Sequence, residues 1–133
     1  MTRYRSMLLA ILSLALLLLG GCASTPAYLE SECPVFTELG TVRANPAGAL
    51  DLHLAVEASF RVAPPVEGLA EIRRKHIELK HEMLALLSAK SQADLNDPLR
   101  VEKLQQELLR MVNERIMRKG RVIEVFVTGF ELQ

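Results

Sequence analysis

The stretch LDLHLAVEASFRV, residues 50–62, decides the fold of this sequence. Every second position in it is apolar, and most positions between them are polar. The apolar positions are Leu50, Leu52, Leu54, Val56, Ala58, Phe60 and Val62. This two-residue period predicts a long β-strand with one buried face and one face toward water or a partner. Pro64 and Pro65 follow directly and end the strand.

Two amphipathic helices are expected downstream, over residues 66–89 and 98–119. The apolar positions of the first are Ile72, His76, Leu79, Met83, Leu86 and Leu87, and Glu71, Lys75, Glu78 and Glu82 point away from them. The second has Val101, Leu104, Leu108, Met111, Val112 and Ile116 on one face, and Glu102, Lys103, Gln106, Arg110, Asn113 and Glu114 opposite. The polar stretch 88–96 separates the helices. Asp97 and Pro98 suit the start of the second helix, and Gly120 offers the left-handed position that ends it.

The last segment, residues 121–133, predicts a strand that is apolar on both faces. Ile123, Val125 and Val127 form one face, and Val122, Phe126 and Phe130 form the other. Such a strand is usually central in its sheet. We therefore expect an α+β domain, a small mixed sheet with two long amphipathic helices on one face, whose core includes Leu108 and Phe126.

The N-terminal residues have the layout of a bacterial lipoprotein signal. Arg3 and Arg5 form a basic head, an apolar run follows, and Leu19-Gly20-Gly21-Cys22 has small residues before a cysteine. A retained transmembrane helix is the alternative, but the apolar run is shorter than the roughly 20 residues that a span needs. The sequence therefore predicts a signal peptide over residues 1–21 and lipidation of Cys22, with acyl chains such as palmitate.

Three regions follow from this interpretation: the signal peptide 1–21, a lipidated cysteine and tether over residues 22–33, and one domain over residues 34–133. Removing 21 of 133 residues leaves 112, enough for one compact domain. Loss of two arginines leaves 14 basic against 16 acidic residues, so a nucleic-acid partner is not expected. Cys33 has no second free thiol in the chain, and is either a small buried residue or an intermolecular bridge.

The sequence carries no recognisable active-site pattern. Its histidines are His53, His76 and His81, and the last two are five residues apart, which places them on different sides of a helix. No phosphate-binding glycine loop and no nucleophile motif is present. We expect no enzyme activity, no cofactor, no metal and no small-molecule substrate. His76, inside the apolar stripe, is either a hydrogen-bonded residue at the core margin or a pH-sensitive contact between subunits.

The last 50 residues resemble the periplasmic part of the FliL family. The resemblance lies in Leu86-Leu87-Ser88-Ala89-Lys90-Ser91 followed by Asp94-Leu95, in a helix with Leu104, Leu108 and Asn113, in Gly120, and in the terminal strand that closes with Phe130-Glu131-Leu132-Gln133. It implies a fold similar to stomatin-type (SPFH) domains and self-association. It also implies contact with stator units of the MotA and MotB kind, and a role in flagellar motility, swarming and chemotaxis.

The family resemblance and the lipidation signal around Cys22 imply different membranes. The family implies the inner membrane and the flagellar basal body, whereas Ala23 after the acylated cysteine suggests transport to the outer membrane. In both cases the domain lies on the periplasmic side. Two functions are therefore kept: a motor accessory lipoprotein that binds and modulates stator units, and an envelope lipoprotein that uses the domain as a scaffold or ring-forming module.

Overall fold

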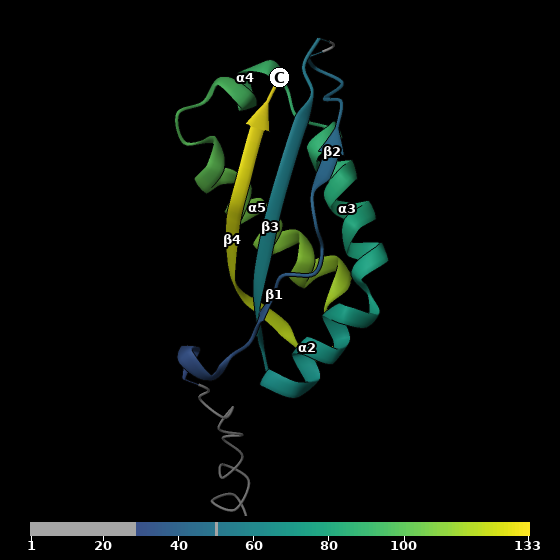
Figure 1. The fold of residues 1–133 in the computed structure, drawn as a ribbon, viewed down its shortest axis with the longest axis vertical. Helices are drawn as coiled ribbons and strands as arrows, with labels where there is room; N and C mark the ends of the chain where they lie inside the picture. The colour runs from purple at the N-terminus through teal and green to yellow at the C-terminus, as the bar shows by residue number, and fades with distance from the viewer. Residues whose placement is uncertain (1–28, 50) are drawn as a thin grey trace, which may run out of the picture.

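The computed structural model describes residues 29–49 and 51–133 (Figure 1). The predicted signal peptide, Cys22 and most of the predicted tether lie outside the described residues. The elements are η2 (Glu30–Glu32), β1 (Val35–Phe36), β2 (Val42–Ala44), β3 (Leu54–Ala63), α2 (Pro65–Arg74), α3 (His76–Ser88), α4 (Gln92–Asn96), α5 (Arg100–Met111), the π-helix η3 (Val112–Ile116) and β4 (Arg121–Leu132).

The sheet is built around β3, the strand that the alternating stretch predicts. β4 pairs with β3 along the whole length of β3. β1 and β2 pair with the other edge of β3. Each of these strand pairs is antiparallel, so the sheet is not the mixed one that was expected. Figure 1 shows α5 behind β3 and β4, α3 along the side of β2, and α2 at the lower end of the sheet. The α+β class is confirmed.

The core lies between the helices and one face of the sheet. The alternating residues of β3, from Leu54 to Val62, are all buried, as the sequence predicts. Ile72, Leu79, Met83, Leu87, Leu104, Leu108, Met111, Val112 and Ile116 meet them from the helices. The predicted apolar positions of both helices are therefore largely confirmed.

β4 is an edge strand, so the prediction that it is central was wrong. Its register on β3 shifts twice, between Glu57 and Ala58 and between Arg61 and Val62. Each β-bulge moves one residue out of the alternation and reverses which face the next side chains meet. Inward residues are therefore not evenly spaced along β4, and the strand appears apolar on both sides in the sequence although only one side faces the core.

The bulges place Phe126 on the open face of the sheet. It pairs with Ser59 and is half-buried, with the Arg61 guanidinium 5.4 Å from its ring centroid. Nε of Arg61 also lies 3.1 Å from Oε2 of Glu124. Phe126 therefore belongs to a surface cluster and not to the buried core to which the sequence pattern assigned it.

The first predicted helix is broken at Lys75 into α2 and α3. The break changes the direction of the chain, and Glu71, which was expected to point into solvent, is only 2% exposed. His76, which was expected in the apolar stripe, is exposed at the first position of α3. The polar stretch after α3 also contains a short helix, α4, which the sequence analysis did not predict.

The signals expected at the two ends of the second helix are both wrong in detail. α5 starts at Arg100 with Leu99 at its N-cap position and no side-chain cap hydrogen bond, and Oδ1 of Asp97 accepts the N–H of Leu99 at 2.8 Å in the turn that precedes the helix. Gly120 does not adopt the left-handed conformation that was expected of it. A Cβ there would lie 2.7 Å from Cα of Gly68 and 3.0 Å from the carbonyl oxygen of Ala63. Gly120 is needed for this close approach of backbones.

Leu108 and Phe126 provide a test of this packing. Leu108 is fully buried, so Leu108→Ala should lower the free energy of unfolding by about 2–5 kcal/mol. Phe126→Ala should lower the free energy of unfolding by about 1 kcal/mol, because the ring is half-buried and its removal eliminates mainly the contact with Arg61. Urea denaturation of both variants measures the difference, and equal losses would contradict the placement of Phe126.

Candidate functional site

Glu71, near the end of α2, holds the turn that leads into β4. Its Oε1 accepts the backbone N–H of Arg118 at 2.9 Å, and its Oε2 accepts those of Lys119 and Gly120 at 2.9 and 2.8 Å. Consecutive N–H groups that converge in this way form an anion-binding nest. We call this arrangement, the Glu71 carboxylate in the N–H groups of residues 118–120, the carboxylate clamp.

Lys75, at the break between α2 and α3, completes the clamp. Its Nζ lies 3.0 Å from Oε1 of Glu71 and donates to the carbonyl oxygen of Ile116 at 2.6 Å. The ammonium group therefore neutralises the buried carboxylate and also binds the last carbonyl of η3. One ion pair joins the end of α2, the end of η3 and the start of β4.

The surroundings of Glu71 keep it ionised. Burial acts to raise the pKa, but the N–H of Gly120, the Lys75 ammonium and the N–H groups of Lys119 and Arg118 together lower the pKa from 4.5 to about 2. A shift of this size stabilises the folded state by roughly 3 kcal/mol at neutral pH. The stabilisation is complete above the unfolded pKa near 4.5 and is lost as the pH falls toward about 2.

Sequence reasoning missed the clamp although a weak signal for it exists. Glu71, Lys75 and Leu79 are spaced by four residues, so they share one side of a continuous helix, and Leu79 is buried. A Glu-Lys pair bordering an apolar arc is normally a surface ion pair. The turn that accepts the carboxylate lies more than 40 residues away, and no local pattern connects the two segments.

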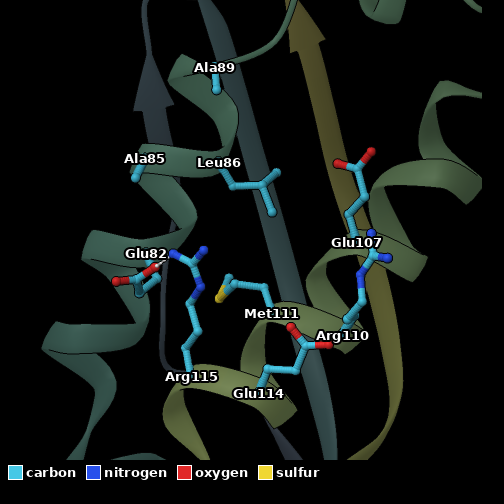
Figure 2. A pocket seen from close by; sticks show the side chains of 9 residues that line it. All are labelled: Glu82, Ala85, Leu86, Ala89, Glu107, Arg110, Met111, Glu114 and Arg115. Carbon is cyan, nitrogen blue, oxygen red and sulfur yellow. Dashed lines mark hydrogen bonds and ion pairs between the residues drawn. The ribbon is translucent and has the colours of Figure 1, made fainter.

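A groove lies between α3 on one side and α5 with η3 on the other (Figure 2). Its volume is about 380 Å³, and it is lined by Glu82, Ala85, Leu86, Ala89, Glu107, Arg110, Met111, Glu114 and Arg115. Figure 2 shows Leu86 and Met111 in the middle of the groove and the charged side chains around them. Nη1 of Arg115 lies 2.7 Å from Oε2 of Glu82, which joins the two walls. We call this surface the helical groove.

The residues singled out from the sequence lie apart from one another. Cys22 is outside the described residues, and Cys33 is buried with a free thiol, in agreement with the small-buried interpretation. Nδ1 of His76 lies 2.8 Å from the carbonyl oxygen of Arg73, so the expected hydrogen bond is present, but the side chain is exposed and not at the core margin. His53 binds Asn45 instead, with 2.7 Å between Nδ1 and Oδ1.

The described residues contain no group of three His, Cys, Asp or Glu side chains placed to hold a metal ion. Within residues 29–49 and 51–133, no helix has both the length and the hydropathy needed to cross a membrane.

The fold defines a small α+β domain with an antiparallel sheet, helices against one face and a helical groove between two of them. Comparison with known families adds that residues 36–133, well over half of the chain, match the family described as flagellar basal body-associated protein FliL. The chain belongs to the FliL family and is a flagellar basal body-associated accessory protein. A search of curated protein sequences finds no match to it.

The pH dependence of stability tests the clamp. Glu71→Gln keeps the shape of the side chain but removes its charge, and should lower the free energy of unfolding by roughly 3 kcal/mol at pH 7. The gap between this variant and the parent should close as the pH falls toward 2, because the parent then loses the same charge. Urea denaturation at several pH values measures this difference in the free energy of unfolding. Glu78→Gln is the control, because Glu78 is exposed. An equal gap at all pH values would contradict the clamp.

Proposed function

We propose that this chain is a lipid-anchored accessory of the flagellar motor whose domain binds and modulates stator units. The observation that supports it most is the FliL family match over residues 36–133, which covers nearly all of the folded domain. The partner expected from the resemblance is a stator protein of the MotA or MotB kind. The predicted lipidation of Cys22 keeps the domain on the periplasmic side of a membrane, where such a partner is accessible.

The helical groove is the proposed contact for the stator partner. Its apolar part, Leu86 and Met111, lies between two helices, and Ala85 and Ala89 leave space above α3 for a third. An amphipathic helix binds such a groove through apolar residues spaced by three or four positions.

Charges around the groove would orient the partner. Glu82 of α3 pairs with Arg115 of η3, and Lys90, two residues after α3, pairs with Glu107 of α5. Within the described part of the chain, the side chains of Arg110 and Glu114 form no ion pair. They stand four residues apart and can each pair with an opposite charge on a partner helix. Two such pairs would fix the direction in which the partner helix lies in the groove.

A second candidate function is favoured by the residues around the lipidation site. Ala23 directly after Cys22 suggests the outer membrane, away from the stators. There the domain would act as an envelope scaffold or ring-forming module through self-association.

The outer edge of β4 offers a route to self-association. The Asn113 side chain donates to the carbonyl of Val122 and accepts its N–H, both at 2.8 Å, and Gln105 donates to the carbonyl of Val125 at 3.2 Å. These side chains occupy the first half of the edge. The backbone of residues 127–132 is left for strand pairing with a second copy.

Motility separates the two candidates. Deletion of the gene should reduce swimming speed and swarming, and complementation with the wild type should restore both. Cys22→Ser should not restore them, because the domain is then not held at the membrane. Unchanged motility in the deletion strain, especially with an envelope-stress phenotype, would refute the motor function and favour the scaffold.

Ala85→Trp tests the helical groove. Ala85 is exposed in the groove, so an indole there should block a partner helix while changing the free energy of unfolding by no more than about 0.5 kcal/mol. Swarming and co-purification of the MotB-like subunit should both fall. Ala93→Trp, at an exposed position of α4 outside the groove, is the matched control. Normal stator capture by Ala85→Trp would exclude the groove as the contact.

A further inference from the structure

The chain enters the domain at the end of β3 that carries Ala63. The N–H of Val62 donates to the carbonyl oxygen of Pro34 at 3.1 Å, and Val35 pairs with Arg61. Residues 29–33 therefore lie at this end of the sheet, which is the lower end in Figure 1, near α2. A lipid on Cys22 would attach the domain to its membrane from this end.

The same end gathers the first turn of α2 and the turn before β4. Gly120 approaches Gly68 and Ala63 so closely that a Cβ there would lie 2.7 Å from Cα of Gly68. Arg121 pairs with Ala63 across the strands. Val66, two residues before Gly68, is 76% exposed.

The side chains on these two turns are mainly basic. Arg118, Lys119 and Arg121 are all exposed, and Glu67 is the acidic residue among residues 64–68 and 117–121. The carboxylate clamp binds the backbone N–H groups of residues 118–120 and fixes the turn. Nη1 of Arg118 donates to the carbonyl oxygen of Glu114 at 3.0 Å, and the Arg118 side chain remains exposed. An exposed apolar residue beside three cations matches the chemistry of an anionic lipid surface.

We propose that this basic end surface, made of Val66, Arg118, Lys119 and Arg121, docks on anionic phospholipid headgroups of the membrane that holds the lipid anchor. The inference rests on the lipidation of Cys22 in the proposed function. The tether of residues 23–33 extends to at most about 40 Å, which is short enough to keep the domain near the headgroups. Docking would place the α4 end of the domain away from the membrane and give the helical groove a defined orientation.

Depth-dependent fluorescence quenching tests the docking with the full chain in vesicles. The chain is reconstituted in phosphatidylcholine with or without phosphatidylglycerol, and brominated lipid quenches a dye attached through Val66→Cys. The native cysteines do not compete, because Cys33 is buried and the Cys22 thiol carries the lipid. Leu99→Cys is the control label, since Leu99 is 56% exposed at the opposite end of the domain, beside Arg100.

The two labels should respond differently to lipid charge. The dye at position 66 should be quenched in anionic vesicles and released in neutral vesicles or at high salt, and the dye at position 99 should be quenched in neither. Substituting Arg118→Gln, Lys119→Gln and Arg121→Gln together should release the dye, with docking about fivefold weaker for each removed charge. Arg43→Gln, Lys80→Gln and Arg100→Gln, three exposed residues elsewhere, form the charge-matched control.

Flotation of the same samples separates the docking from the anchor. A chain that floats with vesicles but shows equal quenching at position 66 in anionic and neutral lipid refutes the docking alone. Full quenching in the variant without the three basic residues refutes it as well. A wild-type chain that does not float refutes the lipid anchor and the docking that rests on it.

Discussion

The carboxylate of Glu71 connects segments that are distant in the sequence. It accepts three consecutive backbone N–H groups from residues 118–120 while Lys75 binds both the carboxylate and the carbonyl of Ile116. Without the charge, three backbone donors would lose their partner and the half-buried ammonium of Lys75 would lose one of its two, which is more costly than loss of an ordinary surface ion pair. The turn held in this way sets where β4 begins and which side chains meet the end of the domain.

The position of β4 determines the surfaces that the domain can use. Because β4 runs along one edge of β3 and α5 packs behind it, the helical groove forms on the helix side and the open face of the sheet stays opposite. The basic end surface lies where β4 starts. The part of the outer edge of β4 that is proposed for strand pairing, residues 127–132, lies toward the end of the strand. One clamped turn thus fixes the relative placement of a proposed stator contact, a proposed membrane contact and a proposed site of self-association.

Much of the fold was predictable from the sequence, and the failures have physical causes. The period of β3 and the apolar positions from Leu79 to Ile116 depend on local geometry, so they were predicted correctly. The bulges in β4 depend on its pairing with β3, and they made an edge strand resemble a central one. Glu71 was assigned to solvent because its partners lie in a remote turn. Gly120 was assigned a turn conformation because a close approach to Gly68 leaves no trace in sequence spacing.

Hydrogen exchange of the amides of Arg118, Lys119 and Gly120 tests the central claim most directly. If the carboxylate of Glu71 holds this turn, the three amides exchange slowly at neutral pH in the full chain, and all three lose protection together in Glu71→Gln while the amides of β3 keep theirs. Exchange of the three amides at the rate of unprotected loop residues in the wild type would contradict the account.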